Sequence, residues 1–242
     1  MKRSLVGFTL GLLLLAGCTS SEDGNGDETA AEQPTTTVLT ADVVLGRASE
    51  AMTNIDTASF RIDHEGPDVF IDDDDTIGFE GATGRYSAPS SADALVEVTA
   101  LGLSTEIGAV AIDSQIWITN PLTGRWEEGP EALTFNPAQV FDDTSGLSSL
   151  LADGFSDTEL VSIDPDADGR YQVSGSVDPQ RVSDLTDGLI DDVSNATVWV
   201  DADTYRVAEV SFDVELEGVA SSWRLYLDEY GSDVTITQPE LG

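Results

Sequence analysis

His64 is the only histidine in the sequence, which restricts the catalysis or metal binding that the chain could perform. A Ser-His-Asp triad or a histidine-based metal site would have to use this side chain. Phe60 and Ile62 are expected on the same strand face as His64, with Asp63 and Glu65 on the other. We therefore interpret His64 as a packing or rim residue. The sequence shows no nucleophile elbow, phosphate loop or dinucleotide fingerprint, so we expect a protein that is not an enzyme.

A second candidate for chemistry is the run Asp164-Pro165-Asp166-Ala167-Asp168-Gly169, which imitates the first half of a calcium loop. The complete loop requires a glutamate where Gly175 stands, and a proline inside it is unfavourable. A turn rich in Asp, Pro and Gly explains the same residues without a metal ion. Asp72–Asp75 is likewise expected to be a solvated acidic turn. We predict no metal site and no cofactor.

Cys18 is the only cysteine, and it ends the run Leu15-Ala16-Gly17-Cys18. This run resembles a bacterial lipobox, where a peptidase cuts before the cysteine and the sulfur carries a diacylglycerol. Lys2 and Arg3 followed by the apolar stretch Leu5–Ala16 are typical of a secretory signal, and the stretch is shorter than the about 20 residues of a membrane-spanning helix. The alternatives are an ordinary signal peptide with a chance cysteine, or an uncleaved anchor. Lipidation of Cys18 would exclude disulfides and thiolate metal sites from the remaining chain.

The chain is thus predicted to have three segments: a lipoprotein signal peptide at 1–17, the lipidated Cys18 with a disordered tether at 18–39, and one domain at 40–242. The tether is rich in polar residues and has almost nothing to bury. A flexible segment of about 20 residues has a root-mean-square span of roughly 25 Å. We therefore expect the domain to be lipid-anchored at the cell membrane, on its extracytoplasmic face.

The formal net charge of the chain is −36, and its only lysine is Lys2. Such an excess of acid repels nucleic acid and anionic membrane surfaces, so we expect no nucleic-acid partner. We interpret the charge as a solvated surface suited to a salty habitat. A cationic or metal-bearing partner is the alternative.

Hydrophobic periodicity predicts an α+β domain with one large antiparallel sheet. Apolar residues at helical spacing predict helices over Ala41–Asn54, Pro137–Phe155 and Pro179–Ile190. Within the second range a short helix should run through Phe141, and helical spacing resumes at Leu147 after Ser145-Gly146. Alternating residues predict strands at Phe60–Glu65, Ile77–Glu80, Ala94–Thr99, Leu103–Ile107, Ala109–Ile112, Gln115–Ile118, Thr158–Ile163, Arg170–Val177, Ala196–Val200, Ala208–Leu216, Trp223–Asp228 and Val234–Thr237. The helices should cover the apolar face of a curved sheet, and a hydrophobic cavity results where they do not fill it.

The order of several short segments resembles the LppX/LprA/LprF/LprG family of actinobacterial lipoproteins. The similarity runs from about Thr40 to Pro239. The segments that carry it are Ile116-Trp117-Ile118, Pro121-Leu122-Thr123-Gly124-Arg125-Trp126, Asn136-Pro137, Gly146-Leu147 with Leu150-Leu151, Tyr171-Gln172-Val173-Ser174-Gly175 and Val198-Trp199-Val200-Asp201. Each segment is weak alone, but their order and spacing behind a lipobox are specific.

This resemblance implies a half-barrel sheet wrapped around helices, related in shape to the LolA/LolB carriers. It also implies a cavity that holds a multi-acyl lipid or glycolipid in transit through the cell envelope, with an envelope transporter as a further partner. Side-chain alternation then suggests these cavity residues: Phe60, Ile62, Ile116, Ile118, Leu147, Leu150, Leu151, Val198, Val200, Val210, Phe212, Val214 and Leu225. The alternative is a non-enzymatic envelope interaction or regulatory module with a filled core, and an envelope hydrolase ranks behind both.

Overall fold

The computed structural model describes residues 38–71, 76–100, 102–129, 137–142, 144–186, 188–190, 192–216 and 218–242. The predicted signal peptide, Cys18, nearly all of the predicted tether and the acidic run Asp72–Asp75 lie outside these residues. Val38–Gly242 forms a compact unit. Every described residue of its hydrophobic core lies between Leu39 and Tyr230, so the unit supplies its own core and can be studied as a fragment.

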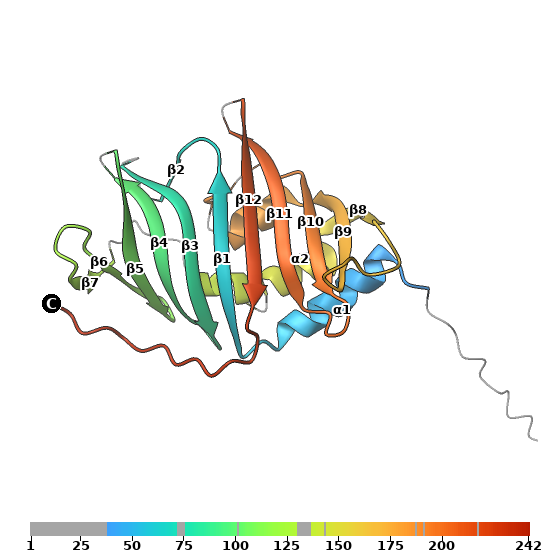
Figure 1. Ribbon diagram of the computed structural model, residues 1–242, viewed down its shortest axis with the longest axis horizontal. Helices are drawn as coiled ribbons and strands as arrows, with labels where there is room; N and C mark the ends of the chain where they lie inside the picture. The colour runs from blue at the N-terminus through green and yellow to red at the C-terminus, as the bar shows by residue number, and fades with distance from the viewer. Residues whose placement is uncertain are drawn as a thin grey trace, which may run out of the picture. The chain divides into compact units, whose positions relative to one another are not determined.

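The described part of this unit forms one 12-stranded sheet in which every pairing is antiparallel. The strands follow the order β7-β6-β5-β4-β3-β1-β12-β11-β10-β9-β8, and β2 pairs with β3 (Figure 1). The sheet is open, because β7 and β8 stand at its two ends and do not pair with each other. The strand bounds are β1 (Thr57–Glu65), β2 (Val69–Phe70), β3 (Ile77–Ser87), β4 (Ser91–Ala100), β5 (Leu103–Ile112), β6 (Gln115–Thr119), β7 (Trp126–Glu128), β8 (Phe155–Leu160), β9 (Arg170–Val177), β10 (Asn195–Asp201), β11 (Val207–Leu216) and β12 (Val219–Asp228).

The helices lie behind the sheet in the view of Figure 1. Their bounds are α1 (Ala41–Thr53), the 3-10 helix η1 (Pro137–Phe141), α2 (Leu147–Asp153) and α3 (Pro179–Leu185). The side chain of Thr40 accepts a hydrogen bond from the Val43 amide at the start of α1, and Asp178 caps α3 with Pro179 in its first turn. None of the helices within the described ranges is long and apolar enough to cross a membrane.

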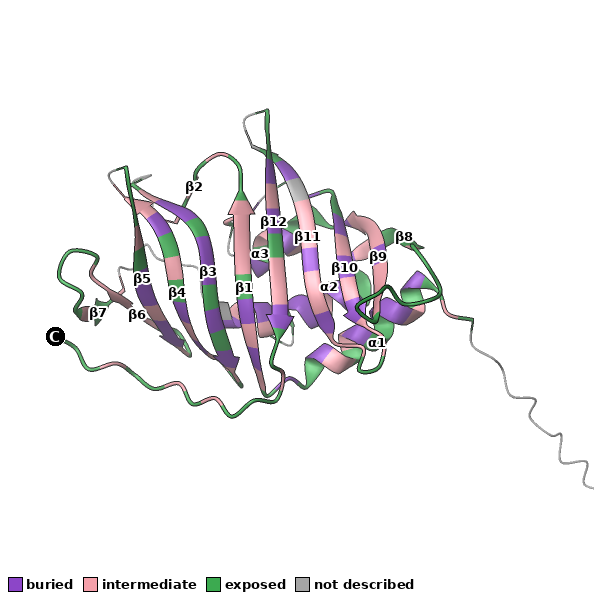
Figure 2. Cartoon of the chain, viewed as in Figure 1, coloured by how far each residue is buried: buried purple, intermediate pink, exposed green. Residues whose placement is uncertain are grey.

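The predicted alternation of the strands places one apolar face against the helices. On β10, Ala196, Val198 and Val200 are buried, whereas the residues between them are partly exposed. Figure 2 shows the same banding along the strands. The prediction of a large antiparallel sheet with a few helices on one face is therefore confirmed, as is the α1 helix.

Several predicted boundaries of strands and helices were wrong, and two of them lie at glycines. Gly108 does not divide two strands but lies inside β5. A glycine is needed there because a side chain would approach the Trp126 ring to 2.9 Å. The predicted short helix from Pro137 through Phe141 and the helical stretch that begins at Leu147 are both present, as η1 and α2, but α2 ends at Asp153, with Gly154 as its C-cap, and does not reach Phe155. Phe155 consequently begins β8.

Two further predictions were wrong: the end of the helix α3 and the last predicted strand. The helix predicted to reach Ile190 stops at Leu185, because the Thr186 hydroxyl bonds to the Val182 carbonyl and accepts from the Ile190 amide, which turns the chain. Val234–Thr237 is not a strand of the sheet. Its alternation reflects partial burial of Val234 and Ile236 rather than strand pairing.

Candidate functional site

An apolar cavity of about 70 Å³ lies between the inner face of the sheet and the helices η1, α2 and α3. The sheet supplies residues from β1, β3, β9, β10, β11 and β12. The lining residues are Ile62, Phe79, Val140, Leu147, Leu150, Val177, Val182, Leu185, Thr186, Leu189, Ile190, Ala196, Val210, Phe212, Trp223, Arg224 and Leu225. Arg224 alternates with Trp223 and Leu225 on β12 and pairs with Asp63 and Ser211, so its side chain belongs to the opposite face.

A tight turn positions α2 over this cavity. The Asp142 carboxylate accepts hydrogen bonds from the backbone amides of Thr144 and Ser145, each at 2.9 Å, and from both of their hydroxyls. These bonds, chiefly that from the Thr144 hydroxyl, lower the pKa of Asp142 to about 2. The Gly146 amide then donates to the Asp142 carbonyl at 2.8 Å, and α2 starts with Leu147 turned into the cavity.

The structure brings together six of the predicted cavity residues. These are Ile62, Leu147, Leu150, Val210, Phe212 and Leu225. The other predicted residues do not line the cavity: Phe60, Leu151, Val198, Val200 and Val214 are packed in the core, and Ile116 and Ile118 lie on β6, near the far end of the sheet. For the residues on strands, alternation identified the inner face of the sheet correctly. It cannot say which part of that face borders the cavity.

Sequence reasoning missed several lining residues. Phe79 was placed on a strand without a role. It lines the cavity because the register of β3 with β4 shifts between Phe79 and Gly81, which turns Phe79 to the side of Ile62. Val182, Leu185, Leu189 and Ile190 were recognised as an apolar stripe at helical spacing. That stripe was the available signal for the helical wall of the cavity.

His64 lies beside this site but does not form an accessible catalytic pair. Its Nε2 lies 2.9 Å from the Ser221 Oγ, and Ser221 is only 1% exposed. Burial of the ring lowers the pKa of His64 below its usual value, against an opposing hydrogen bond to the backbone of Phe79 and the charge of Asp68. A neutral histidine beside a buried hydroxyl fits the packing interpretation better than that of a nucleophile open to substrate.

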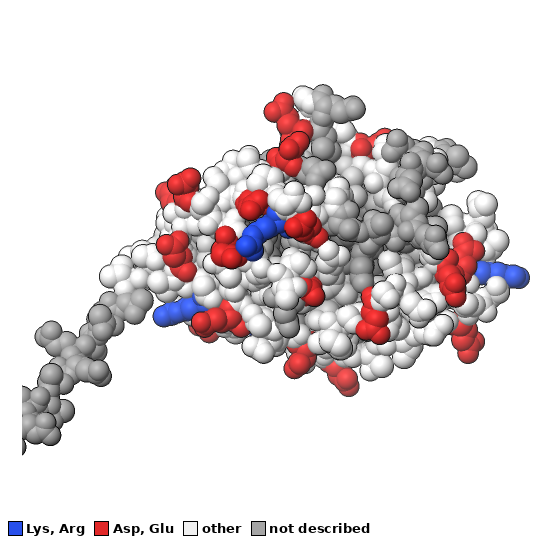
Figure 3. Space-filling model, turned by 180° about the vertical axis from the view of Figure 1, so that it is seen from behind, with Lys and Arg blue, Asp and Glu red and all other residues white. Residues whose placement is uncertain are grey.

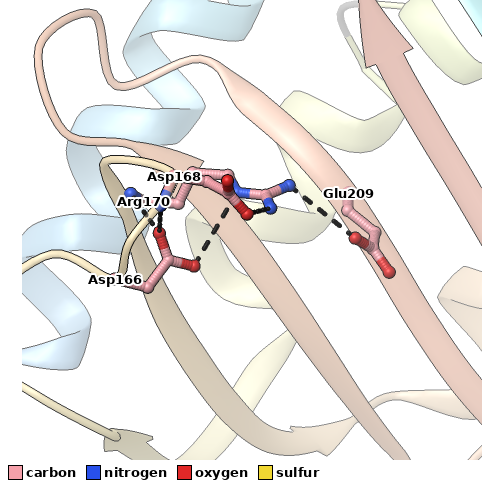
Figure 4. Close-up of polar contacts among 4 residues, drawn as sticks. All are labelled: Asp166, Asp168, Arg170 and Glu209. Carbon is pink, nitrogen blue, oxygen red and sulfur yellow. Dashed lines mark hydrogen bonds and ion pairs between the residues drawn. The ribbon is translucent and has the colours of Figure 1, made fainter.

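The calcium-like run forms a turn held by an arginine (Figure 4). The Asp166 side chain accepts from the Asp168 and Arg170 amides at 2.9 and 2.8 Å. The Arg170 guanidinium contacts Asp168 at 2.6 Å and Glu209 at 3.9 Å. These carboxylates are therefore turned toward a cation that the protein itself provides. Among the residues that the structure describes, no cluster of three or more His, Cys, Asp or Glu side chains is arranged to hold a metal ion.

A second and larger hollow, of about 710 Å³, lies on the opposite face of the sheet, across β12, β1, β3, β4 and β5. Its walls carry charge. The Arg61 guanidinium lies 3.9 Å from the centre of the Tyr226 ring, and Arg85 forms an ion pair with Asp93. On the face that Figure 3 shows, which is the helical side, carboxylates are spread over the surface with few arginines among them.

Comparison with known proteins agrees with this geometry. The curated relatives include the lipoarabinomannan carrier protein LprG of Mycobacterium tuberculosis, which is 28% identical over 156 residues. That match covers 62% of this chain and 64% of the relative.

Two solved structures share the fold. LprF from Mycobacterium bovis superimposes with a TM-score of 0.64 at 15% identity, covering 84% of this chain and 97% of that chain. LppX from Mycobacterium tuberculosis gives a TM-score of 0.58 at 13% identity, covering 81% of this chain and 98% of that one. The LppX_LprAFG lipoprotein model matches residues 40–236, and the chain therefore belongs to the LppX/LprA/LprF/LprG family of lipoproteins.

Proposed function

We propose that this protein binds a multi-acyl lipid or glycolipid through its acyl chains and carries it across the cell envelope. The observation that carries the proposal is the almost wholly apolar lining of the cavity beneath η1, α2 and α3. Transfer of one methylene from water to such a lining contributes about 0.8 kcal/mol, so a chain of about 16 carbons gains roughly 10 kcal/mol. The relative named as a lipoarabinomannan carrier supports the same class of cargo.

Binding requires the cavity to open. Its volume is about 70 Å³, whereas sites for small organic ligands occupy about 300–1,000 Å³. Polar contacts join α2 to α3, because Arg181 pairs with Asp153 at 2.5 Å and donates to the Ser149 hydroxyl at 3.2 Å. Their contact with the sheet across the cavity is apolar. We propose that α2 and α3 move together away from the sheet when acyl chains enter.

The small volume also favours the second candidate function, an envelope interaction or regulatory module with a filled core. The two functions differ in one measurable property, which is lipid stoichiometry. The fragment Val38–Gly242 is produced in a lipid-rich host, and native mass spectrometry counts the lipid that it retains. One lipid per chain is expected for the carrier. A folded fragment that retains no lipid and takes up none that is added would replace the carrier with the interaction module.

A cavity-filling variant makes this test specific. Ala196 lines the cavity from β10, and Ala196→Leu places three further carbons in the space that an acyl chain would occupy. We expect lipid loading to fall by at least tenfold while urea denaturation shows a folded domain. The matched control is Ala208→Leu on β11, which is partly exposed and does not line the cavity. Equal loading of the two variants would place the lipid elsewhere.

We also propose that Cys18 carries the lipid anchor that holds the domain at the extracytoplasmic face of the cell membrane. The proposal is supported by membership in a lipoprotein family and by the run Leu15-Ala16-Gly17-Cys18. Metabolic labelling of the full chain with radioactive palmitate should mark the wild type and not the Cys18→Ala variant. Equal labelling of both would refute the assignment.

A further inference from the structure

Four aromatic side chains lie side by side on the inner face of the sheet, and we call them the aromatic row: Phe79, His64, Trp223 and Phe212. They stand on β3, β1, β12 and β11, which are neighbours in the sheet. Trp223 pairs in register with His64 on one side and with Phe212 on the other. The Trp223 ring centre lies 4.4 Å from that of His64, 5.7 Å from Phe79 and 6.5 Å from Phe212. The rings of Phe79 and Phe212 are nearly parallel to the indole, so Trp223 is held in one orientation.

The indole N–H of Trp223 is buried without an acceptor. Trp223 is 3% exposed, and its Nε1 has no hydrogen-bond partner in the structure described here. An indole nitrogen can only donate, and a buried donor that is left unpaired destabilises a protein. The nearby His64 Nε2 is already engaged with the Ser221 hydroxyl at 2.9 Å.

Trp223 is one of the lining residues, and its Nε1 exposes less than 1 Å² while the cavity is closed. A ligand can supply the missing acceptor once α2 and α3 have moved away from the sheet. The lining also limits the charge of that acceptor. Arg224 is the only charged residue among the described lining residues, and its side chain belongs to the opposite face. A phosphate or carboxylate beside Trp223 would be a buried charge without a partner, which is strongly unfavourable. The acceptor that fits is an uncharged oxygen attached to apolar chains.

We propose that the indole N–H of Trp223 donates a hydrogen bond to an acyl-ester carbonyl oxygen of the bound lipid. This inference rests on the proposed function and adds a binding residue and a ligand group to it. The bond fixes how far the lipid enters, since the ester must stop at the aromatic row. The acyl chain beyond the ester then lies among apolar residues such as Leu150, Leu185 and Val210. The polar part of the lipid is directed toward the end of the sheet where β1 finishes and β12 begins.

The test compares two lipids that differ only in this acceptor. A diacylglycerol carries two ester carbonyls, whereas the dialkylglycerol of equal chain length has ether oxygens, which are weaker acceptors. Binding of each to the fragment Val38–Gly242 is measured by native mass spectrometry and by displacement of a fluorescent acyl lipid. We expect the ester lipid to bind about threefold to tenfold more tightly, the effect of one neutral hydrogen bond.

Variants connect this preference to Trp223. In Trp223→Phe a smaller aromatic ring replaces the indole and the N–H donor is lost, so both lipids should bind equally. Trp199→Phe is the matched control, because Trp199 is partly exposed on the opposite face of β10, and its preference for the ester should equal that of the wild type. If the wild type binds both lipids equally, or Trp223→Phe keeps the preference, the inference is overturned while the carrier function stands. Binding of neither lipid would overturn both. The wild-type comparison decides the matter even if Trp223→Phe does not fold.

Discussion

Of the two hollows described above, the smaller one is better suited to acyl chains. The inner cavity has a volume of about 70 Å³ and apolar walls, whereas the groove on the other face has about 710 Å³ and charged walls. Apolar walls close on one another, because closure removes them from water and adds dispersion contacts. The groove mixes apolar residues with charged ones, and closing it would take Arg61 and Arg85 out of the water in which they interact with Tyr226 and Asp93. Wall chemistry, rather than volume, identifies the hollow that suits acyl chains.

The largest expected effect comes from the same truncation made in each hollow. Leu150 lines the cavity and is 5% exposed, whereas Leu95 lines the groove and is 56% exposed. We expect Leu150→Ala to lower the free energy of unfolding by about 2–4 kcal/mol and Leu95→Ala to change it by less than about 0.5 kcal/mol. Urea denaturation measures both. Similar losses would mean that the two hollows are equally part of the core.

The next effect tests how α2 is held over the cavity. A side chain at Gly146 would collide with the backbone oxygen of Asp142 and lie 2.7 Å from its backbone nitrogen. Gly146→Ala should therefore displace the turn before α2, at a cost of about 1–3 kcal/mol, and lower lipid loading. Gly46→Ala in α1 is the control, because a side chain there meets nothing within 4 Å and should be neutral or slightly stabilising. Normal loading of Gly146→Ala would show that the position of α2 does not control the cavity.

A smaller effect is expected in the groove. Arg85 donates from Nε to Asp93 at 3.0 Å, and this bond raises the pKa of Arg85. Because the pair is partly exposed, Arg85→Ala should cost at most about 1 kcal/mol. Lipid loading, measured by native mass spectrometry, should remain at the wild-type value. A fall in loading would reveal that the groove takes part in lipid binding and would end the distinction between the two hollows.

The smallest effect is the contribution of Asp142 to stability as pH changes. Its pKa of about 2 is below the value of about 3.9 for an unfolded aspartate, so the folded state favours the carboxylate. The contribution is therefore complete above about pH 4 and is lost as the pH falls toward 2. Since Asp142 is largely exposed, we expect at most about 1 kcal/mol. In Asp142→Asn the fall in unfolding free energy over this pH range should be smaller than in the wild type, and an unchanged slope would contradict the assignment.

The strands show how far local pattern can predict the fold. Residues Ala208–Leu216 alternate strictly, and the structure has β11 over Val207–Leu216, paired antiparallel with β12 as expected. The strand break predicted at Gly108 was wrong. A glycine is present there because the Trp126 ring packs against it, and Trp126 lies on β7, two turns later in the chain. Alternation is set by neighbours along the chain, whereas close approach is set by neighbours in space.

The cavity residues show the same difference between neighbours along the chain and neighbours in space. Val198 and Val210 lie opposite each other in the sheet and both are buried, yet only Val210 lines the cavity. Their positions in the sequence pattern are equivalent, because both follow the period of two that marks the inner face of a strand. The difference arises where α2, α3 and the turn after α3 rest on the sheet, and that depends on contacts between residues far apart in the chain.

By itself, the sequence determined the antiparallel sheet, the buried face of strands such as β10, and the family. These follow from patterns confined to a few consecutive residues or from short segments in a fixed order. Only the tertiary structure decided that the apolar hollow is narrow, that Leu150 and Val210 share it, and that the Trp223 N–H lacks an acceptor beside it. Those properties depend on how helices and strands pack together, because a cavity and an unpaired buried donor exist only where distant segments meet.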